Sequence, residues 1–411
     1  MKHSANTTHW QRTLYILFIG QLFTAVGFSS IFPFLPLYVR ALGTNTQLSI
    51  EFLSGMVFSA QAVTMMIASP IWGALADRYG RKLMVERAMF GGAAILFLMA
   101  FARSAEELVL LRAIQGLITG TVAAANALVA ATAPRARTGY AMGLLQVGLG
   151  AGISLGPLIG GVIADAYGYQ APFYVTAALL LLSGILIGWG VEEEFVKPEP
   201  SAGQHTSLTA GWRHVLSAPG VPTTYAMRFI SQMGRMMIVP IAPLFIQTLL
   251  PDAERLNTFT GLVVGIAAGA TTISAVYLGR LGDRVGHRRV IIASALVATV
   301  LYLVQSQVRD GWQLLVLQAL VGVAMGGIIP TISALLAGFT QAGEAGAAYG
   351  LDNSIDSAGR SLAPLLGSAV AVWFSLRATF VATGLLFLVT GLLAARLLPR
   401  FKEDKQVSLA S

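Results

Sequence analysis

Two short stretches decide the fold of this chain: GALADRYGRK at residues 73–82 and GRLGDRVGHR at residues 279–288. Both carry glycine, aspartate and arginine in the same order, and Asp283 corresponds to Asp77 at an offset of 206 (283 − 77 = 206). Each stretch follows one long apolar run and precedes another, so each is interpreted as a tight polar loop between two helices. The repetition at half the length of the chain predicts two homologous halves.

The correspondence continues through the apolar runs that follow. At the offset of 206, the residues Leu111, Gly116 and Gly120 fall on Leu317, Gly322 and Gly326. At an offset of 207, the residues Gly143, Gln146, Gly152, Pro157 and Gly160 fall on Gly350, Asn353, Gly359, Pro364 and Gly367. Each half holds an even number of runs, which keeps the orientation, so we expect a parallel repeat about an axis along the membrane normal.

Composition indicates a membrane protein. Of 411 residues, 55% are hydrophobic and only 11% are charged, against roughly a quarter charged in soluble proteins. No nucleophile, base and orienting acid occur together, which argues against an enzyme. The chain has no cysteine, and its five histidines lie near the ends or in loops, so no metal and no cofactor are predicted. The net charge of +8 is spread over short loops, which argues against nucleic acid as a partner.

The apolar runs predict an all-α, polytopic fold with twelve transmembrane helices in two six-helix bundles. The first six spans are predicted at residues 14–39, 51–75, 83–102, 107–132, 138–164 and 171–191. The second six are predicted at residues 219–249, 258–279, 290–308, 312–337, 346–372 and 377–397. The domains are therefore residues 1–191 and 219–411. Residues 192–218 form a linker, whose second part is either a helix on the membrane surface or plain linker.

Orientation follows from the distribution of lysine and arginine. Eighteen of these residues fall in the loops and ends on the side of the N-terminus. Five fall on the other side, namely Arg40, Arg103, Arg255, Arg309 and Arg377. Positive charge marks the cytoplasmic side, so we expect a multi-pass protein of the bacterial inner membrane with both termini in the cytoplasm.

The two loops resemble motif A of the major facilitator superfamily, and the resemblance covers the chain from about Leu14 to Leu398. Glycine permits a tight turn, and Asp77 can accept hydrogen bonds at a helix N-terminus, so the loops are interpreted as a conformational latch. Anchoring of the topology by the basic residues is the alternative. The latch residues are Gly73, Asp77, Arg78, Gly80, Arg81, Gly279, Asp283, Arg284 and Gly286.

Span five resembles motif C, the antiporter signature of the superfamily. It reads GLGAGISLGPLIGG at residues 148–161, and the matching positions are Gly152, Gly156, Pro157, Gly160 and Gly161. Glycines four residues apart form a flat packing face, and proline bends the helix. The resemblance implies export by exchange. A packing face with no bearing on the direction of transport is the alternative.

Charged residues inside the spans are the candidates for proton coupling, because an ionisable group in the membrane is costly. Asp352 and Asp356 lie four residues apart on one face of span eleven, and Arg360 continues that face. Arg112 in span four matches motif B, a position that the resemblance ties to coupling. A fixed Asp356–Arg360 ion pair and a structural Arg112 bonded to carbonyl groups are the alternatives.

Polar residues of the central spans form the predicted substrate cavity. They are Gln61, Asn126, Gln146, Arg228, Gln232, Arg235 and Asn353. Aromatic surface is expected from Phe23, Phe28, Phe34, Tyr225 and Phe229. Four arginines against two aspartates leave the interior positive, which favours an anionic or zwitterionic substrate over a purely cationic one.

The chain is most similar to the multidrug efflux transporters of the MdtG type, in the twelve-span drug:proton antiporter family. The stretches that carry this likeness are FPFLPLYV at 32–39, SPIWGALADRYGRKLM at 69–84 and ANALVAAT at 125–132. Span one lacks the acid that several such exporters carry, and the charges of span eleven depart from the pattern. We expect a monomeric, proton-coupled exporter of drugs or amphipathic metabolites that contacts membrane lipids. A lipid or glycolipid flippase and a non-transporting receptor are the alternatives.

Overall fold

The computed structural model describes residues 3–120, 125, 128–129, 134, 137–191, 193, 216–218, 220–340 and 345–398. Within these residues the chain is helical and has no strand. The first half contains α1 (His3–Ile31), α2 (Leu35–Leu42), α3 (Ile50–Tyr79), α4 (Arg81–Met99), α5 (Ala105–Ile118), α7 (Thr138–Tyr167) and α8 (Ala171–Gly190). The second half contains α10 (Val221–Met237), α11 (Ala242–Leu249), α12 (Leu256–Val285), α13 (His287–Gln305), α14 (Gly311–Phe339), α15 (Ala345–Trp373) and α16 (Leu376–Leu397).

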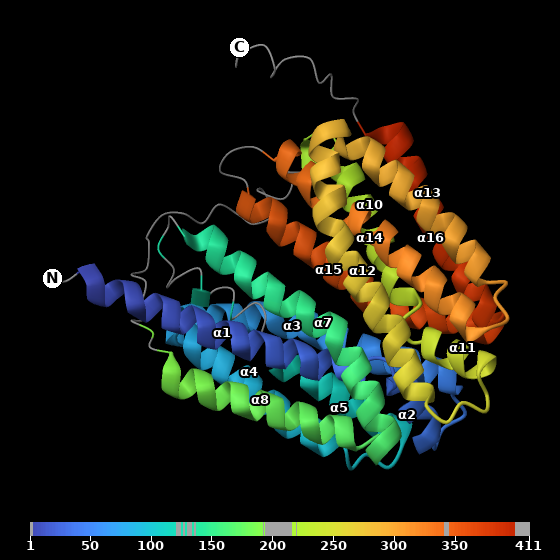
Figure 1. Ribbon diagram of the computed structural model, residues 1–411, viewed down its shortest axis with the longest axis horizontal. Helices are drawn as coiled ribbons and strands as arrows, with labels where there is room; N and C mark the ends of the chain where they lie inside the picture. The colour runs from blue at the N-terminus through green and yellow to red at the C-terminus, as the bar shows by residue number, and fades with distance from the viewer. Residues whose placement is uncertain are drawn as a thin grey trace, which may run out of the picture.

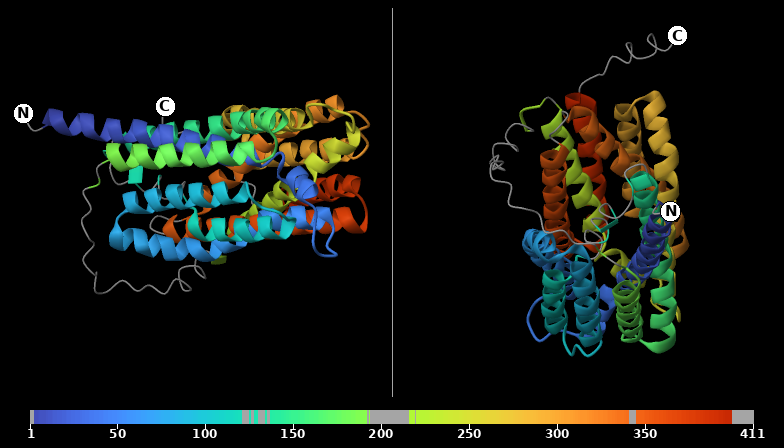
Figure 2. Two further views of the ribbon diagram at one scale, coloured as in Figure 1. Left: turned by 90° about the horizontal axis from the view of Figure 1, so that it is seen from below. Right: turned by 90° about the vertical axis from the view of Figure 1, so that its left-hand side faces the viewer.

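The two halves form two bundles of roughly parallel and antiparallel helices (Figures 1 and 2). We call the end at which α3 joins α4 at Gly80, and α12 joins α13 at Gly286, the signature end, and the other the opposite end. The halves pack together through α7 against α12, α3 against α15 and α2 against α11. The bundles meet near α2 and α11 and diverge towards the signature end (Figure 1).

Eleven of the twelve predicted spans coincide with a helix or a pair of helices, and the fourth coincides with α5 as far as Ile118, beyond which most of its residues lie outside the described part of the chain. Spans one and seven are pairs, because the chain bends between α1 and α2 and between α10 and α11. Pro33 and Pro36 lie at the first bend, and Pro240 and Pro243 lie at the second. Proline cannot donate a backbone hydrogen bond, so it interrupts the helical ladder at both places.

Nine helices or helix pairs in the described residues are long and apolar enough to cross a membrane. The predicted spans outside this group correspond to α4, α5 and α15. The described part of α5 has only 14 residues. Helix α15 carries Asp352, Asp356 and Arg360, and such charges lower its mean hydropathy. One of the three helices that the apolarity criterion excludes, α15, therefore holds the buried acidic residues.

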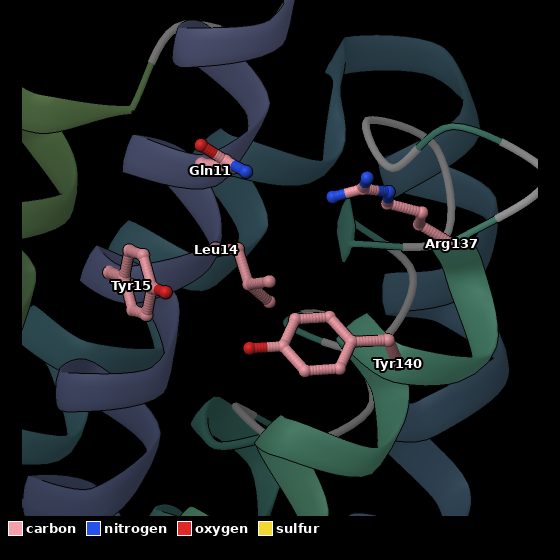
Figure 3. A pocket seen from close by; sticks show the side chains of 5 residues that line it. All are labelled: Gln11, Leu14, Tyr15, Arg137 and Tyr140. Carbon is pink, nitrogen blue, oxygen red and sulfur yellow. The ribbon is translucent and has the colours of Figure 1, made fainter.

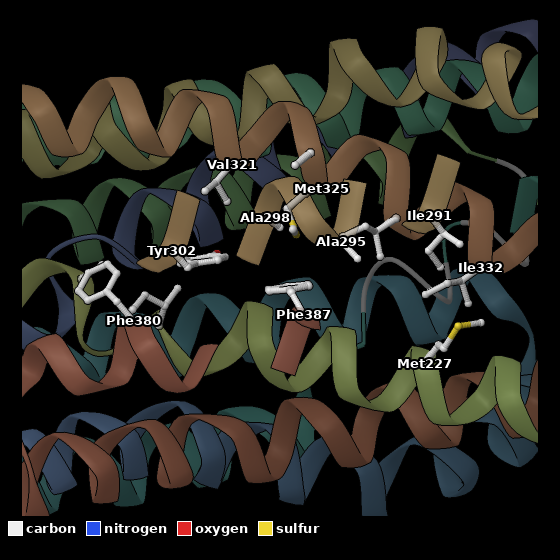
Figure 4. Packing of buried hydrophobic residues seen from close by; sticks show 14 of the residues in the cluster. Met227, Ile291, Ala295, Ala298, Tyr302, Val321, Met325, Ile332, Phe380 and Phe387 are labelled. Atoms are coloured by element: carbon white, nitrogen blue, oxygen red, sulfur yellow. The ribbon is translucent and has the colours of Figure 1, made fainter. Parts of the chain in front are cut away.

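Each half has its own hydrophobic core. Phe380, Phe387 and Tyr302 lie at the centre of the core of the second half, where the rings of Tyr302 and Phe387 stack at 5.6 Å (Figure 4). Phe34, Tyr38 and Phe173 form the corresponding centre in the first half. Large apolar side chains are also exposed on the outer helices, including Phe97, Leu181, Trp189, Val300 and Leu385. Such a surface suits contact with lipid.

Glycine is required where the signature loops turn. Gly80 has φ 98° and Gly286 has φ 94°, a region of backbone conformation that other residues rarely adopt. Each of these glycines ends one long helix and begins the next. The repeated GALADRYGRK pattern thus corresponds to a repeated backbone turn.

Candidate functional site

A cluster of buried charges lies between α10 and α15 in the second half. Arg228 from α10 bridges both acids of α15: its Nη2 lies 3.5 Å from Oδ2 of Asp352, and its Nε lies 3.4 Å from Oδ1 of Asp356. On the other side, Arg360 donates from Nε and Nη2 to Oδ2 of Asp356, at 2.7 and 2.6 Å. The side chains of Asp352 and Asp356 are spaced four residues apart, so both face the same neighbouring helix.

The cluster lies well inside the helical bundle. Asp352 is 8% exposed and Asp356 is 3% exposed. They follow the start of α15 at Ala345 by seven and eleven residues, which corresponds to about 10 and 16 Å along the helix axis. Charges at this depth require partners, since an isolated buried carboxylate is strongly unfavourable.

The two carboxylates differ in how fully they are bonded. Both oxygens of Asp356 face guanidinium groups, whereas Oδ1 of Asp352 has no hydrogen-bond partner among the described residues. Among the described residues Arg228 is the ion-pair partner of Asp352, and the distance of 3.5 Å between them is long for a hydrogen bond. Asp352 can therefore accept a proton with less loss of contact than Asp356.

The same face of α10 continues the polar surface. Arg235 donates from Nη2 to Oε1 of Gln232, and Gln232 packs against Gly359 of α15. A cavity of about 10 Å³ lies beside Arg228, Gln232 and Arg235, and apolar residues of α14 form its other wall. This space is far smaller than a ligand pocket. The second half thus holds three arginines and two aspartates within a few helical turns.

Arg112, the buried charge of the first half, has a different environment. It is 2% exposed, donates from Nη1 to Oε1 of Gln115 at 2.7 Å, and points Nε at the carbonyl oxygen of Val57 at 3.3 Å. Its guanidinium carbon lies 5.9 and 5.8 Å from the ring centroids of Phe32 and Phe58, which stack on each other at 5.5 Å. Within the described residues no carboxylate forms a salt bridge with Arg112.

The motif C residues of α7 face two different neighbours. A Cβ added at Gly160 would lie 2.0 Å from the carbonyl oxygen of Ser30 in α1, and Gly152 and Gly156 also pack closely on α1. Gly161 instead faces the second half, where a Cβ would lie 2.3 Å from the carbonyl oxygen of Asn257. The carbonyl oxygen of Pro157 approaches Gly261 of α12 in the same way.

The packing of α7 on α1 recurs in the second half. Gly359 and Gly367, the counterparts of Gly152 and Gly160, pack against Gln232 and Met237 of α10. Glycines at these positions are therefore explained by close helix approach within each half. Gly161 differs, because it brings the two halves together.

Half of the eight latch residues whose burial is described are exposed, namely Gly73, Arg78, Asp283 and Arg284. Arg78 stacks on Tyr79, and Asp283 lies 3.4 Å from Nε2 of His287 at the start of the next helix. The side chain of Asp77 lies outside the described residues. The backbone N–H groups of Arg81 and Lys82 donate to Glu193 at 3.0 and 2.8 Å, which caps α4. Gly73 and Gly279 have open space around them, and Arg284 is exposed.

Comparison with known families decides the identity of this arrangement. The sequence model described as Major Facilitator Superfamily matches residues 17–248 and 224–410, one match for each half. The chain belongs to the Major Facilitator Superfamily. It is therefore a multi-pass membrane transporter with a small-molecule substrate and not an enzyme.

Relatives within this family are similar over almost the whole chain. Multidrug resistance protein MdtG of Serratia proteamaculans (strain 568) is 36% identical over 384 residues, which cover 92% of each chain. MdtG of Enterobacter lignolyticus (strain SCF1) is 35% identical over 381 residues, which cover 92% of this chain and 90% of the relative. The predicted resemblance to the MdtG type is confirmed.

Solved structures of the family share the fold. A variant of the nucleoside transporter NupG superposes with a TM-score of 0.80 at 12% identity, over 94% of this chain and all of that chain. A bacterial homologue of the human lysosomal transporter Spinster, in an inward-facing and unoccupied conformation, also gives 0.80 at 12% identity, over 94% of this chain and 96% of that one. These structures confirm the predicted all-α fold of two related bundles.

The remaining predicted cavity residues are not brought into the charged cluster. Gln61 is half-buried on α3, whereas Gln146 on α7 and Asn353 on α15 are exposed. Asn126 lies outside the described residues. Phe34 is fully buried in the core of the first half, so the expectation that it forms cavity surface is wrong. The proline bend after α1 turns this ring inward against Tyr169 and Phe173.

A larger pocket lies away from these charges. It has a volume of about 320 Å³ and is lined by Gln11, Leu14 and Tyr15 of α1 together with Arg137 and Tyr140 at the start of α7 (Figure 3). It shares no residue with the charged cluster. Sequence reasoning also missed Phe32 and Phe58 beside Arg112, although Phe32 lies in the quoted FPFLPLYV stretch.

Proposed function

We propose that this transporter is a proton-coupled antiporter that exports drugs or amphipathic metabolites across the inner membrane. The observation that carries the proposal is the position of the Arg228 guanidinium, at ion-pair distance from both Asp352 and Asp356 deep inside the second half. A guanidinium shared by two carboxylates can hold one of them charged while the other takes a proton. Binding and release of that proton then change the contacts between α10 and α15.

Asp352 is the proposed proton carrier. Its Oδ1 has no hydrogen-bond partner among the described residues, whereas Asp356 accepts short hydrogen bonds from Arg360 at Oδ2 and has Arg228 within 3.4 Å of Oδ1. Asp356 and Arg360 serve to hold Arg228 in place, and Arg112 acts from the first half. Ionisable residues in transmembrane segments mark proton relays in pumps and transporters, which supports this division of roles.

Anionic or zwitterionic amphipathic compounds are the proposed substrates. Arg228 and Arg360 pair with the two aspartates, and Arg235 and Arg112 add two cations that form no ion pair with an acid among the described residues. The anionic group of a substrate could replace an aspartate on Arg228, and its apolar body could contact Phe32 and Phe58. The names of the MdtG relatives support drugs as a class of substrate.

Alternating access is the proposed mechanism. The halves are packed together at the opposite end and diverge at the signature end (Figure 1). With both termini in the cytoplasm, this arrangement is open to the inside, and the Spinster homologue of the same fold is named as inward-facing. The exposed signature loops are proposed to latch when the signature end closes. Since each chain holds both halves, the proposed unit is a monomer surrounded by membrane lipid.

Proton release from the purified protein tests the coupling. Candidate anionic, zwitterionic and cationic drugs are added to weakly buffered protein, and the parent is compared with Asp352→Asn, Asp356→Asn and the neighbouring control Ser354→Ala. We expect release from the parent and the control and none from Asp352→Asn. If both aspartate variants release protons like the parent, the coupling assignment is wrong. Release with cations alone would contradict the proposed substrate class.

A lipid or glycolipid flippase of the same fold is the alternative. The pocket between α1 and α7, with Arg137, Tyr15 and Tyr140, has the basic and aromatic character of a lipid headgroup contact (Figure 3). Proteoliposomes with labelled lipids distinguish the two functions. Lipid translocation that depends on the protein and is insensitive to the drugs would favour the flippase.

A further inference from the structure

Asp165, at the end of α7, bonds to the start of α12 in the other half of the molecule. Its Oδ1 accepts from the backbone N–H of Asn257 at 3.1 Å and from the Nδ2 of the same residue at 2.8 Å. Its Oδ2 accepts from the backbone N–H of Thr258 at 2.7 Å and from the hydroxyl of Thr258 at 2.6 Å. One carboxylate therefore receives four hydrogen bonds from two consecutive residues.

These bonds cap the N-terminus of α12. The first N–H groups of a helix lack partners within the helix, and the positive end of the helix dipole attracts a carboxylate. The residue at the N-cap position of α12 is Arg255, which forms no side-chain cap, and the first turn contains no acid. Asp165, which belongs to the first half, supplies the hydrogen-bond acceptor and the negative charge that the start of α12 lacks in its own half.

The equivalent helix of the first half needs no such partner. Helix α3 begins at the position that corresponds to the start of α12 (255 − 49 = 206), and there Ser49 accepts from the N–H of Phe52 at 3.2 Å. Glu51 adds negative charge to that first turn. At the position equivalent to Asp165 the second half has Val372 (372 − 165 = 207), which cannot accept a hydrogen bond. The cap between halves thus occurs at one of the two related interfaces.

Close backbone packing surrounds the cap. Gly161, one helical turn before Asp165, places the α7 backbone against Asn257, and Gly261 places the α12 backbone against Pro157. No side chain separates the helices at these points, so Asp165 reaches the two amides directly. Separation of α7 from α12 at the opposite end would break all four hydrogen bonds together.

We propose that Asp165 is the gate residue that holds the opposite end closed, by capping α12 only while the two halves are together. The role of the gate in transport rests on the alternating access proposed above. The bonds themselves set a preference between two conformations whatever the substrate is. Removal of the carboxylate should therefore shift the molecule towards the form that is open at the opposite end.

Distance measurement between the halves tests the gate. Because the chain has no cysteine, Gln47→Cys and Asp252→Cys introduce a unique pair of labelling sites, one in an exposed loop of each half at the opposite end. Spin labels on this pair report the separation by double electron–electron resonance in lipid nanodiscs. In Asp165→Ala we expect the ratio of open to closed forms to rise about tenfold, or about 1.4 kcal/mol.

Two further variants separate the gate from simple fraying of a helix. Ser49→Ala removes the cap of α3 within its own half and should leave the distance distribution unchanged. Adding Arg255→Ser to Asp165→Ala gives α12 a cap of its own, so it restores the helix terminus without restoring the link between halves. The doubly substituted protein should remain open.

Either of two results would overturn the proposal: a distribution in Asp165→Ala equal to that of the parent, or full closure after addition of Arg255→Ser. The measurement requires neither substrate nor a proton gradient. A protein that failed the proton-release assay but opened on loss of Asp165 would refute the proposed antiport and support the gate. Proton release as expected, together with an Asp165→Ala variant that does not open, would refute the gate and leave the proposed antiport standing.

Discussion

Where the second half carries Arg228, Asp352 and Asp356, the first half carries Gln21, Leu145 and Leu149 at the positions 207 residues earlier. The helices that hold these residues pack alike, α1 on α7 and α10 on α15. The scaffold therefore forms without the charges. A buried ion pair contributes little net stability compared with apolar packing, so the cluster is better explained by function than by folding.

In the fourth span of each half the charge lies instead in the first half. Arg112 of α5 corresponds to Gln318 of α14 at the offset of 206, and both side chains are buried. Arg112 lies seven residues from the opposite end of its helix, whereas Arg228 lies seven residues from the signature end of α10. The two halves thus place these buried cations at different depths.

The largest effect is expected from making the second half resemble the first. Arg228→Gln places glutamine where the first half has Gln21. It leaves Asp356 paired with Arg360 and leaves Asp352 without an ion-pair partner among the described residues. We expect loss of transport and a fall in stability of about 3 kcal/mol, because removal of one partner from a buried ion network is costly. Proton release and thermal unfolding measure the two effects.

The matched control is Gln21→Leu in the first half. It replaces a buried side chain whose Oε1 has no described partner, so neither transport nor the unfolding temperature should fall appreciably. If Gln21→Leu lost as much transport and stability as Arg228→Gln, the proposal that the buried charges of the second half serve transport would be wrong.

A smaller effect is expected from substitution of Arg112, which should raise stability and lower transport. Arg112→Gln introduces the residue of the second half, Gln318, and removes a buried cation for which the described residues provide no acid. We expect stability to rise by about 1 to 3 kcal/mol while transport of anionic drugs falls at least tenfold. Unfolding temperature and uptake into inverted vesicles test the two parts. A fall in both quantities would support the structural alternative for Arg112.

The smallest effect is expected in the loops of the opposite end. Glu106 accepts hydrogen bonds from Thr44, Asn45 and Thr46 of the loop after α2, and the bond from the Thr44 hydroxyl is the main cause that lowers the pKa of Glu106 to about 2. The equivalent position of the second half is Trp312, which contacts Phe259 edge to face at 5.2 Å. One loop is held by a carboxylate and the other by aromatic rings.

The sign of the pH dependence follows from this lowered pKa. A carboxyl whose pKa falls on folding stabilises the protein above its unfolded pKa of about 4.5, and the contribution disappears as the pH falls through about 2. Unfolding temperatures of the parent and Glu106→Gln should therefore differ slightly at pH 7 and converge from pH 4.5 downwards. The difference between the parent and Trp312→Ala should not change with pH over that range.

Sequence reasoning predicted the fold because its signals are periodic and repeated. Eleven of the apolar runs, the described part of the fourth and the GALADRYGRK repeat correspond to observed helices and turns. The glycine pairs Gly116/Gly322, Gly152/Gly359 and Gly160/Gly367 lie where helices approach closely. The charged residues of span eleven were also found, since carboxylates within an apolar run are conspicuous. That Arg228 would bridge both of them was not predictable, because the rotation of α10 against α15 is set by packing around Gly359 and Gly367.

Contacts between the halves were not predicted either, because they too depend on how the helices pack. Asp165 stands at the edge of a span, where an acid is ordinary, and its importance depends on which helix terminus lies beside it. The missing cap at Arg255 was the available signal, since serine occupies the corresponding position of the first half. The aromatic pair beside Arg112 depends likewise on how α3 meets the bend after α1.

At the opposite end, Arg40 of α2 donates from Nη1 to Oε1 of Gln247 in α11 at 2.6 Å. These two residues occupy the same position in their respective repeats (247 − 40 = 207), so each touches its own counterpart where the pseudo-two-fold axis leaves the protein. Identical residues there would have set arginine against arginine or amide against amide. Because the two counterparts differ, the guanidinium of Arg40 meets an amide oxygen, and the halves close this contact without placing like charges together.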